Sequence, residues 1–109
     1  MHELSITQSL VDAVLDRTGD RHVTGVNLRI GRLSGVLPDA VRFCFELVSE
    51  GTPLAGAQLR IDEPPGRVRC RSCRQESVLP DMFALCTCGS ADVEVTGGRE
   101  LMLASVEVG

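Results

Sequence analysis

Apolar residues near the start of the chain recur at helical spacing. Between Leu4 and Thr18 they form a stripe along one side of a helix, and Gly19 follows as a residue that commonly ends helices. The apolar positions of this stripe are Leu4, Leu10, Val11, Val14 and Leu15. The pattern therefore predicts an amphipathic helix over residues 4–18.

A second helix is predicted to begin at Pro38 and to end near Gly51. Proline suits the first turn of a helix because the amide hydrogen it lacks has no partner there. Glycine is the residue that most often follows the last turn. The apolar face of this helix comprises Val41, Cys44, Phe45 and Val48. On this pattern Cys44 is interpreted as a core residue rather than a metal ligand.

Three segments alternate between apolar and polar residues, which is typical of half-buried strands. They cover residues 22–30, 57–61 and 102–108. The last segment is too apolar to be stable alone, so we expect it to return to the sheet formed by the other two.

A Pro64-Pro65-Gly66 break separates the first two strands from a segment that contains four cysteines. We therefore predict an α+β fold with two helices packed on a small sheet of about three strands. Residues 1–65, completed by a C-terminal strand over 98–109, would form this domain. Residues 66–97 would form an inserted, zinc-ribbon-like module.

The four cysteines of that module form two close pairs. Cys70 and Cys73 are followed after twelve residues by Cys86 and Cys88. Two such pairs can place four thiolates around one ion, and zinc is the usual occupant of a tetrahedral sulfur site. A disulfide or redox role is the alternative for the same thiols. The second pair has one intervening residue, fewer than is usual, so we expect that half of the site to be strained.

Composition and charge exclude several functional classes. The net charge is −4, and the chain has no Trp and no Tyr, which disfavours a general nucleic-acid surface. Five cysteines with this spacing suit metal binding in a reducing cytoplasm. We expect no membrane span and no signal peptide. With two histidines the sequence offers no assignable Ser-His-Asp set, and it has no glycine loop with a following lysine to bind phosphate.

The N-terminus offers a second set of metal donors. Met1 provides an α-amine with an ordinary pKa of about 8, and His2 provides an amide nitrogen and an imidazole. Planar nitrogen donors of this kind favour nickel(II) or copper(II) over zinc. A histidine at position two is more often part of a solvated chain end. On this pattern alone, a metal site and a solvated chain end are both open.

Several motifs together resemble the HypA/HybF family of hydrogenase nickel-incorporation proteins. They include the Met1-His2-Glu3 start, the segment 23–26, the segment 43–46, the cysteine pairs ending in Cys88-Gly89, and the closing segment 98–101. The resemblance runs from the first residue nearly to the last. The second cysteine pair departs from the family's Cys-Pro-x-Cys pattern.

This resemblance implies a metallochaperone without catalytic turnover, which delivers nickel during maturation of [NiFe]-hydrogenases in the cytoplasm. Nickel(II) would be transient cargo bound by Met1, His2 and Glu3. Structural zinc would be bound by Cys70, Cys73, Cys86 and Cys88. The implied partners are the GTPase HypB and the hydrogenase large subunit. The resemblance leaves a homodimer open.

Two other functions use the same cysteines. One is a zinc-ribbon adaptor that binds nucleic acid or a transcription complex, and the other is a rubredoxin-like electron carrier with iron. Arg67, Arg69, Arg71 and Arg74 surround the first cysteine pair. They could form a nucleic-acid patch or could offset the charge of a metal–thiolate cluster. Neither alternative explains the N-terminal triplet.

Overall fold

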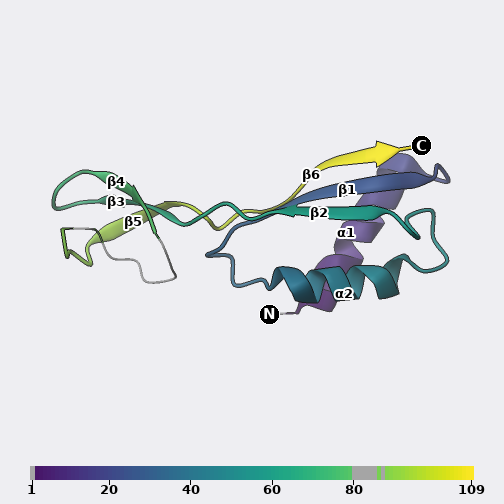
Figure 1. Ribbon diagram of the computed structural model, residues 1–109, viewed down its shortest axis with the longest axis horizontal. Coiled ribbons are helices and arrows are strands. Elements are labelled where there is room, and N and C mark those ends of the chain that lie inside the picture. The colour runs from purple at the N-terminus through teal and green to yellow at the C-terminus, as the bar shows by residue number, and fades with distance from the viewer. Residues whose placement is uncertain (1, 80–85, 87) are drawn as a thin grey trace. The chain divides into compact units, whose positions relative to one another are not determined.

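The computed structural model describes residues 2–79, 86 and 88–109 (Figure 1). In this part of the chain the helices are α1 (Glu3–Thr18) and α2 (Pro38–Ser49). The strands are β1 (Val23–Ile30), β2 (Gln58–Asp62), β3 (Arg67–Cys70), β4 (Glu76–Val78), β5 (Val93–Gly97) and β6 (Leu101–Val108). The elements group into two compact units. Residues 1–28, 36–61 and 102–109 form the first, and residues 29–35 and 62–101 form the second.

The first unit contains two helices on one side of a three-stranded sheet of order β2-β1-β6 (Figure 1). The last strand of the chain therefore pairs with β1, as its apolar character predicted. Pro38 occupies the first turn of α2, also as predicted. The predicted α+β class with two helices on a three-stranded sheet is confirmed.

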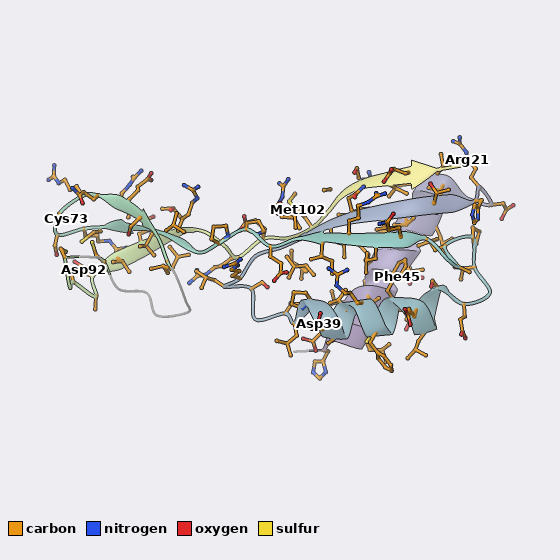
Figure 2. The ribbon with its side chains drawn as sticks, viewed as in Figure 1. Arg21, Asp39, Phe45, Cys73, Asp92 and Met102 are labelled. Carbon is orange, nitrogen blue, oxygen red and sulfur yellow. The ribbon has the colours of Figure 1, made fainter. Side chains whose placement is uncertain are left out.

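The core of the first unit lies between these helices and the sheet. Figure 2 shows Phe45 directed from α2 toward the strands, and its side chain is only 3% exposed. The other buried apolar residues of these elements include Val11, Val14, Val26, Leu28 and Val41. Because both helices contribute every third or fourth residue to this layer, the helical spacing in the sequence corresponds to the observed core.

One residue of the apolar stripe predicted for the first helix is exposed. Leu4 lies in the first turn of α1 and at the edge of the apolar stripe, and it is 52% exposed. The position one turn further along is Thr7, which is fully buried and donates its hydroxyl hydrogen to the Glu3 carbonyl oxygen over 2.7 Å. A threonine can be buried here because the helix backbone satisfies its hydroxyl group.

The second unit contains a three-stranded sheet of order β4-β3-β5, in which β3 pairs antiparallel with both neighbours. In β3 the residues alternate between exposed arginines and buried side chains. The buried residues of this unit include Val68, Cys70, Leu79 and Cys86. Among the described residues of this unit, two cysteines thus form part of a small core, so the fold of the unit depends on whether their sulfur atoms bind a metal.

Among the described residues, neither helix has the length and apolar character that crossing a bilayer requires.

Candidate metal sites

The second unit brings the sulfur atoms of all four paired cysteines together. Cys70 is the last residue of β3 and Cys73 lies in the turn that follows, while Cys86 and Cys88 precede β5. The four Sγ atoms lie within 4.8 Å of one another. Figure 2 shows Cys73 at the same end of this unit as Asp92, which directly precedes β5.

The closest sulfur contacts join one pair to the other. The Sγ atoms of Cys73 and Cys86 are 3.5 Å apart, and those of Cys70 and Cys88 are 3.7 Å apart. A disulfide would need about 2.05 Å, and the cysteines are free. With zinc–sulfur bonds of about 2.3 Å, a tetrahedral site has sulfurs about 3.8 Å apart. The observed spacing therefore fits one ion at the centre of four thiolates, even with the short second pair.

Each pair repeats the same hydrogen bond from backbone to sulfur. The N–H of Cys73 donates to the Cys70 Sγ over 3.4 Å, and the N–H of Cys88 donates to the Cys86 Sγ over 3.5 Å. In both pairs the acceptor cysteine is buried and the donor cysteine is exposed. The second pair thus forms an equivalent amide–sulfur bond with one residue fewer.

These bonds favour the thiolate at the first cysteine of each pair. The N–H of Cys73 is the main cause that lowers the pKa of Cys70 to about 6. The N–H of Cys88 likewise lowers the pKa of Cys86. At Cys73 the N–H of Gln75 favours the thiolate, but hydrogen bonding to Cys86 and burial outweigh it and raise the pKa to about 11. A divalent cation would be needed to hold all four groups deprotonated together.

The residue after each pair adopts a left-handed backbone conformation. Arg74 follows Cys73 with a φ of 63°, and Gly89 follows Cys88 with a φ of 90°. The Arg74 N–H donates to the Cys70 carbonyl over 2.8 Å, which closes the first turn. Glycine adopts this conformation without strain, whereas a residue with a Cβ atom does not. Both turns therefore fold back sharply just after their second sulfur.

Two of the arginines near the first pair form ion pairs with carboxylates. Arg69 lies 3.1 Å from Glu76, its partner across the β3–β4 ladder, and Arg71 lies 3.0 Å from Asp92. The two turns are also joined by a contact of 3.1 Å between the hydroxyl oxygens of Ser72 and Ser90. This part of the surface is thus a mixture of paired charges, which is a poor match for a nucleic-acid backbone.

Cys44 does not belong to this cluster. The group of cysteine, histidine and carboxylate donors found among the described residues contains only the four paired cysteines. Cys44 lies on α2 and is half-buried. Its position agrees with a packing role for a small apolar side chain.

The N-terminal donors lie at the start of α1, with Met1 outside the described residues. His2 is exposed and precedes the helix, and its carbonyl oxygen accepts the N–H of Ile6 over 3.1 Å. His22, the other histidine of the chain, is also exposed and precedes β1. The exposure of His2 leaves its imidazole accessible from solvent.

The Glu3 carboxylate has a role that sequence reasoning missed. Its Oε2 atom accepts the N–H of Leu37, the residue just before α2, over 3.3 Å. Hydrogen bonds from the Glu3 N–H and then from Leu37 lower the pKa of this carboxyl. The first turn of α1 is therefore linked to the start of α2, 34 residues later.

Comparison with known proteins gives consistent results over the whole chain. Residues 1–108 match the family described as "Hydrogenase/urease nickel incorporation, metallochaperone, hypA". The chain is 45% identical to "Hydrogenase maturation factor HypA" of Nostoc sp. over 108 residues, which cover 99% of this chain and 96% of the relative. It is 46% identical to the protein of the same name from Geotalea uraniireducens, with 99% of each chain covered.

The fold is also similar to a solved structure. The solution structure of "the Ni metallochaperone HypA from Helicobacter pylori" aligns with a TM-score of 0.66 at 25% identity. The alignment covers 99% of this chain and 97% of the other. The sequence comparison and the fold comparison thus match this chain to the same group of proteins, from the first residue nearly to the last.

Proposed function

Because this chain belongs to the HypA family of hydrogenase/urease nickel-incorporation metallochaperones, we propose that it binds nickel(II) and delivers it for [NiFe]-hydrogenase maturation. A family match over 108 of 109 residues is the observation that carries this proposal. The family consists of metallochaperones, so the protein is not an enzyme and nickel is its cargo.

The proposed nickel ligands are the Met1 amine, the His2 amide and imidazole nitrogens, and the Glu3 amide nitrogen. An N–H in the first turn of an α-helix has no partner within the helix ladder. The Glu3 N–H instead bonds its own carboxylate, so its deprotonation would break no ladder bond of α1. The carboxylate is also bonded to Leu37, which supports the amide rather than the carboxylate as the fourth donor.

We propose zinc as the ion of the sulfur cluster, bound by Cys70, Cys73, Cys86 and Cys88. The spacing of the sulfurs and their all-thiolate chemistry support zinc over harder cations. Bound zinc would crosslink the two cysteine turns, whose described buried residues are few. Its role would be structural because four protein ligands leave no open coordination position.

The proposed partners are a HypB-type GTPase and the large subunit of a [NiFe]-hydrogenase, in the cytoplasm. The chain has no phosphate-binding loop of its own, so nucleotide hydrolysis would be the task of the GTPase. A homodimer is compatible with this function. No observation on the described residues favours the nucleic-acid adaptor.

A metal titration of untagged protein tests the nickel site. Wild-type protein should bind nickel(II) with the absorption spectrum of a square-planar, diamagnetic complex. His2→Ala should abolish this spectrum, whereas His22→Ala, which removes the other histidine, should leave it unchanged. Zinc content, measured on the same samples, should be the same in all three proteins.

Chemical modification of the N-terminal amine provides a second test of the nickel ligands. All basic side chains of the chain are arginines, so the α-amine is its one primary amine. Acylation by an amine-directed reagent should therefore block nickel binding without changing zinc content. Square-planar nickel binding that persists in His2→Ala, or after complete acylation, would contradict the proposed ligands.

A further inference from the structure

Helix α2 exposes apolar side chains on the side that faces solvent. Phe43 is 65% exposed and Leu47 is 54% exposed, and residues four apart lie next to each other on a helix. Helical geometry places Asp39, Glu46 and Glu50 beside them, and all three are exposed. We call these five residues the outer face of α2. Exposed apolar residues bordered by charged ones are typical of protein interaction sites.

A pocket adjoins the outer face near the end of α2. Its volume is about 370 Å³, and its lining includes Phe45, Glu46, Ser49, Glu50 and Ala57. Phe45 and Ser49 are buried, while Glu46 and Glu50 are exposed and so lie at its solvent edge. An aromatic ring and carboxylates in one lining suit the aliphatic stem and charged group of an arginine or lysine.

The two carboxylates at this edge lie at an unfavourable end of the helix. The carbonyl end of an α-helix carries partial negative charge and is stabilised by cations. The last turn of α2 has no basic residue, and Glu50 is its C-terminal capping position. Neither Glu46 nor Glu50 forms an ion pair with another described residue. Arg42, the basic residue of α2, instead contacts Asp39 and the Leu59 carbonyl oxygen.

We propose that the outer face of α2 docks a protein segment that carries an arginine or lysine flanked by apolar side chains. The cation would enter the pocket between Glu46 and Glu50 and would relieve their repulsion with the helix terminus. The apolar side chains would cover Phe43 and Leu47. Aromatic residues and charge complementarity are the usual sources of affinity and specificity in such contacts.

The negative charges of the outer face of α2 favour a cationic protein segment over nucleic acid or an anionic membrane. Nucleic-acid phosphates and anionic lipid head groups would be repelled by Asp39, Glu46 and Glu50. A partner that presents positive charge would instead be attracted by these carboxylates. A second copy of this chain could also present arginine, and the experiment below separates that case from a different protein.

The test uses the full chain and a defined peptide probe. The probe is a short synthetic helical peptide with one central arginine and a leucine one turn away on each side. A matched peptide contains citrulline, a neutral group of nearly the same shape, in place of arginine. The arginine peptide should shift the backbone amide signals of α2 and of residues 55–57. It should bind about tenfold more tightly than the citrulline peptide, and this difference should shrink as salt concentration rises.

Two double variants locate the charge effect. Glu46→Gln with Glu50→Gln should weaken binding of the arginine peptide about tenfold and should leave the citrulline peptide unaffected. Asp12→Asn with Asp16→Asn removes the same charge from exposed positions of α1 and should leave both affinities unchanged. Phe43→Ala should weaken both peptides, and circular dichroism should show that every variant is folded.

Three results would overturn the proposal. The peptides could bind equally, the shifts could map to another surface, or the α1 variant could weaken binding as much as the α2 variant. Self-association is tested by adding unlabelled protein to labelled protein without peptide. If this shifts the same α2 signals at similar concentrations, the occupant is a second copy and the proposed partner is wrong.

Discussion

Gly31 lies directly against the backbone of Gly98. A Cβ atom on Gly31 would overlap the Gly98 carbonyl group and would lie 2.8 Å from the Glu100 nitrogen. Two hydrogen bonds hold these segments together, from the Gly31 N–H to the Glu100 carbonyl over 2.7 Å and from the Leu33 N–H to the Gly98 carbonyl over 2.6 Å. The loop after β1 and the loop before β6 are therefore in contact through their backbones.

This contact predicts that Gly31→Ala will be strongly destabilising. Backbone atoms must move to accommodate the methyl group, so we expect the free energy of unfolding to fall by about 3 kcal/mol. Gly25→Ala is the matched control, because its Cβ atom would meet only the ends of the Glu107 and Arg60 side chains, at 2.6 and 3.1 Å. Urea unfolding should show a clearly smaller loss for this variant. Equal losses would mean that the Gly31 contact is not rigid.

The sulfur cluster predicts different outcomes for two cysteine substitutions. Cys73→Ala should release the zinc and unfold the second unit, because ligand bonds supply much of the stability of its small core. Helices α1 and α2 should remain. Cys44→Ala should keep full zinc content and should cost about 1 kcal/mol through a small cavity. Zinc analysis and circular dichroism distinguish these outcomes, and a full equivalent of zinc in Cys73→Ala would exclude Cys73 as a ligand.

The ion pair between Arg60 and Glu107 predicts a pH-dependent contribution to stability. These residues join β2 to β6 across β1, and Arg60 followed by Asn27 lowers the pKa of the Glu107 carboxyl. A carboxyl with a lowered pKa stabilises the fold above its unfolded-state value of about 4.3, and this effect disappears as pH falls through the lower folded value. Glu107→Gln should therefore reduce stability at pH 7, and this reduction should shrink as the pH falls below about 4.

A double-mutant cycle isolates this pair from other acid effects. The coupling between Arg60→Gln and Glu107→Gln, measured by urea unfolding, should be present at pH 7 and smaller in acid, below about pH 4. Coupling of the same size at both pH values would show that charge is not its cause. The contribution should be small because both side chains are about half exposed.

The Glu3 carboxylate predicts a separation between nickel binding and stability. Glu3→Gln keeps the amide nitrogen, so the square-planar nickel spectrum should remain. The same change removes the negative charge that accepts the Leu37 N–H, so the thermal midpoint should fall by a few degrees. Loss of the nickel spectrum in a folded Glu3→Gln protein would identify the carboxylate as a ligand.

Local sequence patterns predicted the first unit well because its elements are long and regular. The apolar spacing of α1 and α2 and the alternation in β1 follow directly from residues close in sequence, whereas burial along β6 does not follow its predicted alternation. The sheet β4-β3-β5 was not predicted, since β3 and β4 are only four and three residues long and alternate arginine or glutamate with few apolar residues. Their formation depends on pairing between distant segments.

In the candidate sites, too, features set by residues close in sequence could be predicted, and features set by distant segments could not. Cysteine spacing predicted a four-sulfur cluster, because close pairs on tight turns bring their own ligands together. The bond between Glu3 and Leu37 could not be predicted, since it joins two residues with no pattern in common. The contact of Leu33 with Gly98 likewise depends on the path of the chain after β1. The donor in each is a backbone N–H, which every residue except proline carries, so the residue type of the donor gives no signal in the sequence.

Each cysteine pair has one buried and one exposed residue, and this difference determines the order in which the sulfurs would bind and release a metal. Cys70 and Cys86 are buried, whereas Cys73 and Cys88 face solvent, so the cluster has one open side. A metal carried by a small chelator would meet the two outer sulfurs first, and would reach the inner two after it had lost its carrier. Removal would run in reverse, with the inner sulfurs released first and the outer sulfurs last, once the chelator holds the metal. Exchange kinetics should therefore respond to the bulk of the chelator, even where the equilibrium affinity does not.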